Sequence, residues 1–317
     1  MSASCPLPPR SPAPLPSLRG SIVPVVTPFR NGALDLEGLA RLIDWQIASG
    51  SHGISVTGTT GEPTSLTMEE RKLVIRAAAE AVAHRVPFVP GTGSTNHAET
   101  LELSRYAESL GVDAVLVITP YYSRPSQQGL FLHFDAVAKA VGLPVILYNI
   151  PGRTAVNLEI DTVARLRDAN RNIAGVKESN KDFEHINRLL HRMGRDFLVY
   201  SGIELLCFPI LAIGGAGYVS ATGNLMPKEV ASLYDLVRAG EWQQAQDLHY
   251  RLLPLNDAVF MEINPVPVKS ALGMMGLISP EVRLPLSPLS EGNRARLRDI
   301  LAEYHLLPIE KRVSETM

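Results

Sequence analysis

The chain has 317 residues, of which 45% are hydrophobic and 20% charged, an ordinary globular composition long enough for one α/β barrel or two smaller domains. Its net charge of -2 offers no footprint for nucleic acid or an anionic membrane, and no apolar run approaches the roughly 18 residues of a membrane span. Cys5 and Cys207 lack metal-site spacing, so we expect a cytoplasmic protein in a reducing compartment.

The N-terminal stretch, residues 1–18, is rich in proline and serine. It has no apolar segment of the kind that a secretory signal requires, so we predict a disordered tail. The folded chain is expected to begin at about residue 19.

A repeating pattern starts at Ser21, in which a short apolar or β-branched run is followed by a helical stretch. The predicted strands are residues 21–29, 52–58, 87–93, 113–120, 144–151, 173–179, 197–202 and 217–223. The predicted helices are residues 36–49, 68–82, 96–110, 126–141, 158–168, 182–193, 204–213 and 227–239. Side chains suited to N-capping stand before the first four helices: Asp35, Thr67 with Glu70, Asn96 or Thr95, and Ser126.

Eight strands that alternate with eight helices indicate a parallel sheet, because each parallel crossover needs a helix. The number eight favours a closed (β/α)8 TIM barrel over an open doubly wound sheet, whose G-x-G-x-x-G turn is missing after the first strand. Further helical stretches follow at 241–260, 266–275 and 292–303. We therefore predict a barrel at residues 19–240 with a C-terminal helical extension at residues 241–317.

The active sites of such barrels lie at the carboxyl ends of the strands. In this chain that rule brings together hydroxyl groups, tyrosines and one lysine, but no pair of carboxylates or histidines. The strand ends read Thr27-Pro28, Gly58-Thr59-Thr60-Gly61-Glu62, Thr92-Gly93, Thr119-Pro120-Tyr121-Tyr122, Tyr148-Asn149, Lys177-Glu178, Ser201-Gly202 and Ser220-Ala221-Thr222.

Lys177 stands out because it ends the apolar run 173–176. Burying an ammonium without a partner costs several kcal/mol, and desolvation favours the neutral, nucleophilic amine. A lysine that forms a Schiff base with a carbonyl substrate needs such an amine. The alternative is a strand-end lysine that extends to water, and this stretch alone favours that alternative.

Three other features have a functional and a structural interpretation. Residues 58–62 form a glycine-flanked turn that can bind a carboxylate or only satisfy its own backbone. Tyr121, Tyr122 and Tyr148 can relay protons without a carboxylate, or serve as core aromatics. Arg153 can clamp a carboxylate of the substrate or form a surface ion pair.

Metal chemistry finds little support, because the eight histidines are scattered and none makes H-x-H or H-x-x-x-H. The segment 214–217 is glycine-rich, but no lysine or arginine stands near it, so close packing around a small ligand is favoured over a phosphate loop.

Together these motifs resemble the dihydrodipicolinate synthase and N-acetylneuraminate lyase family of class I, pyruvate-dependent aldolases, from about residue 21 to about residue 307. Any one motif is weak, but five in this order and spacing are highly specific. They are Gly58-Thr-Thr-Gly-Glu62, Pro120-Tyr-Tyr-x-Arg-Pro125, Tyr148-Asn-Ile-Pro-x-Arg153, Gly175-Val-Lys-Glu178 and Asn264-Pro-Val-Pro-Val-Lys269.

The resemblance implies a TIM barrel, usually a homotetramer built as a dimer of dimers. It implies that Lys177 is the Schiff-base lysine and that Tyr148 shuttles protons. Thr59 and Tyr122 match the relay partners of that tyrosine, with Tyr122 reaching in from the neighbouring subunit.

The resemblance also implies substrate contacts. Thr60 matches the residue that holds the pyruvate carboxylate, and Val219 matches a main-chain contact to pyruvate. Gly202, at a strand end, joins the expected substrate-binding residues. Arg153 matches the arginine that binds the aldehyde's carboxylate in the synthases, and sialic-acid lyases generally lack it.

The implied reaction is the condensation of two small molecules without a metal or another cofactor. Lys177 forms an imine with pyruvate, a methyl proton is lost, and the resulting enamine attacks an aldehyde. The expected aldehyde is L-aspartate 4-semialdehyde, whose product is 4-hydroxytetrahydrodipicolinate. One alternative is a related aldolase or hydratase-aldolase for another carboxylated or aromatic aldehyde, and another is a non-catalytic keto-acid-binding paralogue.

The chain departs from the family pattern at Pro63-Thr64-Ser65-Leu66, at Ser123 and at Ser179-Asn180. Lysine-inhibited synthases carry histidine and asparagine in an interface pocket, where this chain has Met68, Arg71 and Thr95, although Glu99 and Tyr121 remain. We therefore predict weak or absent feedback inhibition by lysine.

Overall fold

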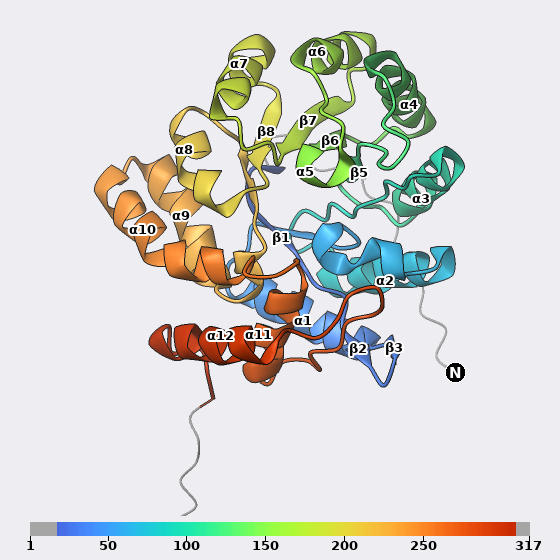
Figure 1. The fold of residues 1–317 in the computed structure, drawn as a ribbon. Coiled ribbons are helices and arrows are strands. Elements are labelled where there is room, and N and C mark those ends of the chain that lie inside the picture. Colours follow the sequence, from blue (N-terminus) through green and yellow to red (C-terminus); the bar gives the residue numbers. More distant parts are fainter. Residues whose placement is uncertain (1–17, 309–317) are drawn as a thin grey trace, which may run out of the picture.

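The computed structural model describes residues 18–308 of the chain (Figure 1). Most of the predicted N-terminal tail, and the last nine residues of the predicted extension, lie outside the described residues. Leu18 was assigned to the tail, but it is buried, and its carbonyl accepts a hydrogen bond from the Tyr200 hydroxyl at 2.7 Å. Leu18 therefore packs with the folded chain and not with the predicted tail.

Seven parallel strands form the main sheet. Six of them lie inside the predicted strands, and the first begins one residue before its predicted start. They are β1 (Gly20–Pro24), β4 (Gly53–Ser55), β5 (Val115–Ile118), β6 (Val145–Asn149), β7 (Ile173–Glu178), β8 (Leu198–Ser201) and β9 (Gly217–Val219). Their order is β4-β1-β9-β8-β7-β6-β5, so the two edges of the sheet are β4 and β5.

The third predicted strand, residues 87–93, joins those two edges. Parallel bridges pair Ile54 with Phe88 and Gly91 with Leu116. The amides of Ile54 and Leu116 donate to the carbonyls of Pro87 and Pro90, each at 2.9 Å. Because proline has no N–H, it cannot donate to a ladder, which explains why this segment is no continuous strand. The segment closes the sheet into the predicted eight-stranded barrel.

Helices surround the barrel, and the chain proceeds around the ring in sequence order (Figure 1). They are α1 (Leu36–Ala48), α2 (Met68–Val82), α3 (His97–Ser109), α4 (Gln127–Ala140), α6 (Ile160–Ala169), α7 (Phe183–Met193), α8 (Cys207–Ala212) and α9 (Pro227–Ala239). The predicted caps are confirmed, since Asp35, Asn96 and Ser126 accept backbone N–H groups of the next helix. Thr67 and Glu70 form the reciprocal capping box.

Several short elements were not predicted. A hairpin joins β2 (Phe29–Arg30) to β3 (Ala33–Leu34), and a one-turn helix α5 (Pro151–Thr154) follows β6. Short 3-10 turns occur at η2 (Thr59–Gly61), η3 (Pro63–Ser65), η4 (Glu204–Leu206) and η5 (Thr222–Asn224). Most of these turns follow strand ends, where they shape the mouth of the barrel.

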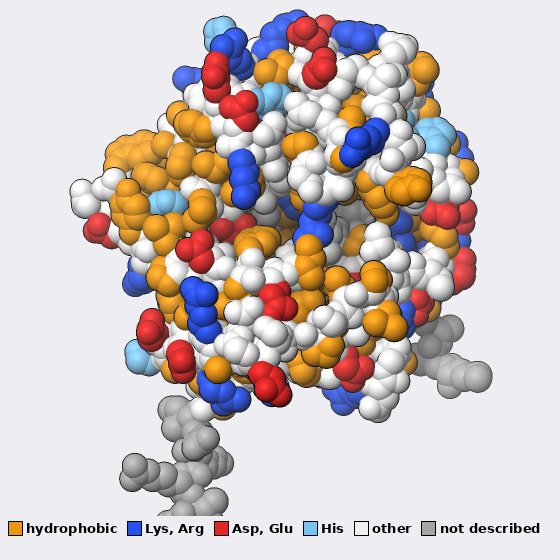
Figure 2. Space-filling model, in the orientation of Figure 1, with side chains coloured by type: hydrophobic (Ala, Val, Ile, Leu, Met, Phe, Trp, Pro, Cys, Tyr) orange, Lys and Arg blue, Asp and Glu red, His pale blue; other side chains and the backbone are white. Residues whose placement is uncertain are grey.

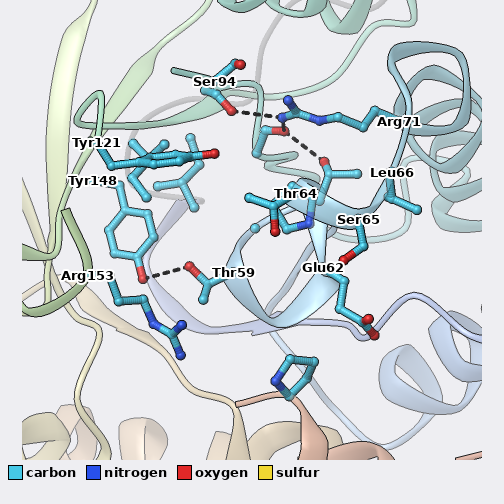
Figure 3. Close-up of a pocket in the computed structure, with 18 of the residues that line it drawn as sticks. Thr59, Glu62, Thr64, Ser65, Leu66, Arg71, Ser94, Tyr121, Tyr148 and Arg153 are labelled. Carbon is cyan, nitrogen blue, oxygen red and sulfur yellow. Dashed lines mark hydrogen bonds between the residues drawn. The ribbon is translucent and has the colours of Figure 1, made fainter. Parts of the chain in front are cut away.

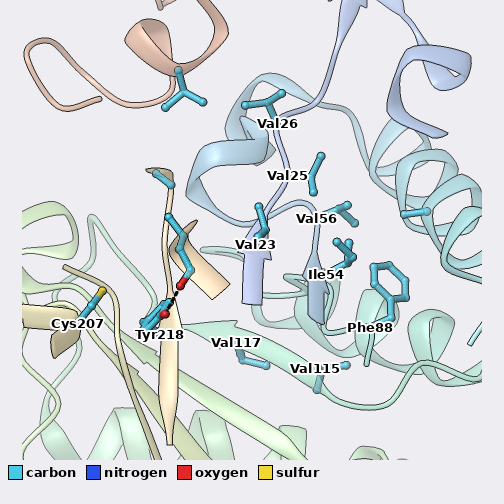
Figure 4. Packing of buried hydrophobic residues seen from close by; sticks show 14 of the residues in the cluster. Val23, Val25, Val26, Ile54, Val56, Phe88, Val115, Val117, Cys207 and Tyr218 are labelled. Carbon is cyan, nitrogen blue, oxygen red and sulfur yellow. Dashed lines mark hydrogen bonds between the residues drawn. The ribbon is translucent and has the colours of Figure 1, made fainter. Parts of the chain in front are cut away.

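Two apolar layers stabilise this arrangement. Alternate strand residues, such as Ile146 and Tyr148, belong to a cluster built from the strand segments and Leu18, which fills the barrel. Their neighbours Val145 and Leu147 belong to a larger cluster that also contains helix residues and lies between the strands and the helices. Figure 4 shows part of this outer cluster. Successive side chains of each strand point alternately into the barrel and toward the helices. The inward positions nearest the mouth can therefore carry polar side chains.

Three C-terminal helices follow, namely α10 (Trp242–Ala258), α11 (Val266–Met274) and α12 (Glu291–Glu303), close to their predicted positions. Their buried residues join the outer cluster, so they pack on the barrel. Within residues 18–308, no helix combines the length and apolar character that a membrane crossing requires.

Candidate active site

Lys177 and Tyr148 lie side by side on neighbouring strands, β7 and β6, where they are direct register partners. Both are buried, with 5% and 3% of their surface exposed. The Lys177 Nζ atom lies 4.1 Å from the centroid of the Tyr148 ring. A lysine and a phenol predicted from separate strand ends are thus in direct contact.

The Lys177 ammonium has no hydrogen bond or ion pair within residues 18–308. Glu178 follows it directly, but strand alternation turns that carboxylate to the other face. There Glu178 accepts hydrogen bonds from Asn149 Nδ2 at 3.0 and 3.1 Å and from the Asn180 amide at 2.7 Å. The amine of Lys177 therefore meets an aromatic ring in place of a paired charge.

Thr59 supplies a second hydroxyl group beside Tyr148. It begins η2, just after Gly58, and its Oγ1 atom lies 3.3 Å from the Tyr148 hydroxyl, within hydrogen-bonding distance. Figure 3 shows the two hydroxyls together, with the Arg153 guanidinium beside them. Two of the predicted relay groups are thus joined across 89 positions of the sequence.

Gly202 borders Lys177 directly. A Cβ atom at this position would come within 2.8 Å of Lys177 Cε and 2.0 Å of Ser179 Oγ. Only glycine leaves room for the lysine side chain here, so Gly202 contributes space to the site.

A cavity of about 540 Å³ lies at this end of the barrel. Thr59, Tyr148 and Arg153 line it, and Figure 2 shows a hollow at the centre of the same face. Lys177 adjoins the cavity through the Tyr148 ring. Arg153 lies on α5, and its guanidinium donates to the carbonyl of Asn264 at 3.3 Å.

The turn that carries Thr59 is anchored to the C-terminal segment. Thr60 Oγ1 accepts a hydrogen bond from Asn264 Nδ2 at 3.0 Å. Glu62 Oε1 accepts one from Lys269 Nζ at 2.6 Å, and both of these side chains are fully buried. Sequence analysis singled out these motifs but did not predict that their side chains pair.

Tyr122 lies apart from this contact, whereas Val219 shares the inner cluster with Tyr148. Tyr122 is 96% exposed, in a left-handed conformation with φ of 69°, and is apart from Tyr148 within the subunit. Val219 is 5% exposed and packs in the inner cluster. The single chain therefore brings together Lys177, Tyr148 and Thr59, but not Tyr122.

Glu204 is a neighbour of the site that sequence analysis missed. It begins η4, it is 5% exposed, and it accepts a hydrogen bond from the Ala221 amide at 2.6 Å. Burial raises the pKa of this carboxyl, while the Lys177 charge and the Ala221 amide favour its ionised form. The sequence feature that could have revealed Glu204 is its position, since it is a charged residue only two positions after the strand end at Gly202.

Metal-binding geometry does not occur in the described part of the chain, where no group of three or more His, Cys, Asp or Glu side chains is placed to hold an ion.

Comparison with known proteins identifies the family. The model of the dihydrodipicolinate synthetase family matches residues 17–304. The chain belongs to the dihydrodipicolinate synthetase family. Within this family, a protein from Thermus thermophilus named 4-hydroxy-tetrahydrodipicolinate synthase is 48% identical over 294 residues, which cover 92% of this chain and 98% of that protein.

Solved structures of the family agree with the fold. Dihydrodipicolinate synthase from Aquifex aeolicus superposes with a TM-score of 0.90 at 40% identity, covering 91% of this chain and 99% of that one. The enzyme from Acinetobacter baumannii, solved in complex with pyruvate, gives a TM-score of 0.88 at 40% identity with the same coverage. The family assignment that the five motifs predicted is confirmed.

Proposed function

We propose that this chain condenses pyruvate with L-aspartate 4-semialdehyde to give 4-hydroxytetrahydrodipicolinate, a step of lysine and diaminopimelate biosynthesis. The observation that carries the proposal is the buried, unpaired Lys177 amine against Tyr148 at the carboxyl end of the barrel. The names of the relatives support the same reaction. Arg153 in the adjoining cavity supports an aldehyde that carries a carboxylate.

The first half of the reaction activates pyruvate. The Lys177 amine adds to the ketone carbon, water leaves, and a carbon–nitrogen double bond forms. The protonated imine withdraws electrons, so a methyl proton leaves and an enamine forms. Tyr148, hydrogen-bonded to Thr59, takes and returns the protons of these steps. The Thr60 turn receives the pyruvate carboxylate, and the Val219 backbone contacts pyruvate from β9.

The second half builds the new carbon–carbon bond. The enamine carbon attacks the aldehyde carbon, and the aldehyde oxygen takes a proton to become a hydroxyl. The amine of the aldehyde-derived half then adds to the imine carbon and displaces Lys177, which closes the ring. The chemistry uses the covalent imine on Lys177, so we propose that no external cofactor takes part.

The proposed assembly is a cytoplasmic homotetramer, in which the barrel at residues 19–240 and the C-terminal helices form each subunit. Tyr122 supports it, because an exposed aromatic side chain at the mouth can complete a neighbour's relay with Tyr148 and Thr59. Apolar side chains also gather over α8 and α10 in Figure 2. Exposed large apolar residues on α10 and beside α8 are Leu205, Ile213, Trp242 and Tyr250. Light scattering during gel filtration measures the mass of the assembly.

The experiment that tests the proposed function has two parts. Borohydride reduction with pyruvate, followed by mass spectrometry, should attach one pyruvate-derived group to Lys177. Turnover of pyruvate and aspartate semialdehyde should then reach a kcat/KM above roughly 10⁴ M⁻¹s⁻¹. Lys177→Ala is the control and should abolish both signals.

The failures of this test are informative. An adduct on Lys177 with turnover far below that value would retain the aldolase and reject aspartate semialdehyde as the aldehyde. The absence of any adduct would reject the aldolase and support a keto-acid-binding protein.

A further inference from the structure

Asn264 lies between α10 and α11, two residues before α11 begins, and it contacts both ends of the proposed substrate site. Its carbonyl accepts a hydrogen bond from the Arg153 guanidinium at 3.3 Å, and its Nδ2 atom donates to Thr60 Oγ1 at 3.0 Å. Asn264 is only 7% exposed, and it lines the 540 Å³ cavity together with Arg153. Its side chain is therefore fixed between the residue proposed to bind the aldehyde's carboxylate and the turn proposed to bind pyruvate.

The other side-chain atom of Asn264 has no partner. Oδ1 is buried and accepts no hydrogen bond from any residue in the described range 18–308. A buried acceptor without a donor costs about 1–3 kcal/mol, so native proteins seldom keep one unless a ligand or water supplies the donor. Since this oxygen belongs to a side chain that lines the cavity, the missing donor points to a bound substrate.

The neighbouring carboxylates are already engaged. Glu62 lines the same cavity, but it accepts hydrogen bonds from Lys269 Nζ at 2.6 Å and from the Arg283 amide at 3.2 Å. Glu99 accepts the Ser94 hydroxyl at 2.7 Å, beside Arg71 on another part of the lining. Asn264 Oδ1 is thus an acceptor that the fold leaves available, on the residue whose backbone carbonyl holds Arg153.

We propose that Asn264 is a specificity-determining residue whose Oδ1 atom accepts a hydrogen bond from the ammonium group of the aldehyde substrate. The inference rests on the proposed function and deepens it. Arg153 selects the carboxylate, and Asn264, whose backbone holds Arg153, selects the amine beside that carboxylate. The site is therefore built for aldehydes that carry a complete amino-acid end, in preference to aldehydes that carry a carboxylate alone.

The test compares two aldehydes that differ only in the amine, L-aspartate 4-semialdehyde and 4-oxobutanoate. Because that amine also releases the product from Lys177, the rate is measured in single turnovers at sub-saturating aldehyde, as loss of the borohydride-trappable pyruvate adduct. A hydrogen bond to a charged group corresponds to roughly a 10- to 100-fold preference, which these wild-type rate constants should show. Asn264→Leu is of similar size but has no acceptor, and it also loses the donor to Thr60. It should therefore slow both aldehydes, but slow aspartate semialdehyde more, so that the preference is lost. Asn264→Asp keeps acceptor oxygens in the same place and should retain or increase the preference.

Two controls separate this role from a structural one. Arg153→Leu should slow both aldehydes equally, because both carry the carboxylate. Borohydride trapping of the pyruvate adduct checks that each variant retains its fold and its Lys177 chemistry.

Three outcomes would overturn the inference. The first is a wild-type protein that does not discriminate between the aldehydes. This outcome is measured on the wild type alone, so it does not depend on whether a variant folds. The second is an Asn264→Leu variant that slows both aldehydes by the same factor. The third is a wild-type protein that forms the pyruvate adduct but does not turn over aspartate semialdehyde, which overturns the proposed function as well.

Discussion

Two buried lysines, one at the end of β7 and one in α11, both lie beside an aromatic ring, but only one of them forms an ion pair. Each ammonium lies 4.1 Å from the centroid of an aromatic ring, Tyr148 for Lys177 and Phe29 for Lys269. Lys269 is fully buried and forms an ion pair with Glu62 at 2.6 Å. Lys177 has no such pair within the described residues, although it is nearly as buried.

The comparison separates a lysine that holds the structure from one that is available for chemistry. Burial lowers the pKa of Lys269 and the Glu62 carboxylate opposes that shift, while their ion pair joins α11 to the turn that carries Thr59. Lys177 is held by no ion pair within the described residues, so its Nζ atom is free to add to a carbonyl carbon. Burial alone therefore does not identify a reactive lysine, whereas burial without an ion pair points to one.

The largest expected effect is on activity, at Lys177. We expect Lys177→Met to reduce turnover by at least ~10³-fold, because the variant cannot form the imine. The same change should leave the thermal unfolding temperature unchanged or raised, since it removes a buried amine that forms no ion pair within the described residues. Calorimetry and kinetics on the same samples measure both effects, and a marked loss of stability would remove the distinction between the two lysines.

The second effect is on stability, at Lys269. Lys269→Met leaves the Glu62 carboxylate buried and unpaired, and we expect the free energy of unfolding to fall by about 3–5 kcal/mol. Urea denaturation measures this change. The double variant Glu62→Gln with Lys269→Met is the matched control.

That double variant should recover part of the lost stability, because it removes the uncompensated charge. Equal stability of the single and double variants would show that the ion pair does not account for the loss.

A buried histidine provides a smaller effect that depends on pH. His133, on α4, has its Nδ1 atom 2.9 Å from Nδ1 of His97 on α3. Burial, with a contribution from His97, lowers the pKa of His133 to about 4. Below the ordinary pKa of about 6.5 the unfolded chain takes the proton first, so stability should fall as the pH drops from there toward 4.

We expect this histidine to reduce the free energy of unfolding by about 2 kcal/mol between pH 7 and pH 5. Denaturation at several pH values, in the wild type and in His133→Phe, measures its contribution. A wild-type slope that persists in the variant would assign the acid sensitivity to other groups.

The smallest expected effect is that of free lysine on the rate. The family resemblance matches Arg71 to the region that carries the lysine pocket, and its guanidinium donates to the carbonyls of Gly91 and Gly93 at 3.1 and 3.0 Å. We expect millimolar lysine to leave turnover nearly unchanged. Half-inhibition at sub-millimolar lysine would contradict this.

Local pattern was sufficient to predict much of the fold and part of the site. Strand runs, helix caps and the position of Lys177 at a strand end all depend on neighbouring residues, and sequence alone shows them. The contact between Tyr148 and Lys177 also follows, because barrel topology makes β6 and β7 neighbours.

What could not be predicted depends on residues that are distant in sequence. Neither Glu62 nor Asn264 carries a local signal that names its partner, because Lys269 and Thr60 lie more than two hundred positions away. The third strand was predicted as a regular strand, but Pro87 and Pro90 reduce it to isolated bridges. Tyr122 was expected from a neighbouring subunit, and one chain does not test that expectation.

The separation of 207 positions between Glu62 and Lys269 has a consequence for biosynthesis of the protein. At a synthesis rate of about 5–20 residues per second, the turn that carries Glu62 waits roughly 10 to 40 s on the ribosome before Lys269 is made. All the barrel strands are complete by then, because β9 ends at Val219. The Glu62 turn can therefore be anchored only after residue 269 has emerged, and we expect its carboxylate to stay without this partner until then.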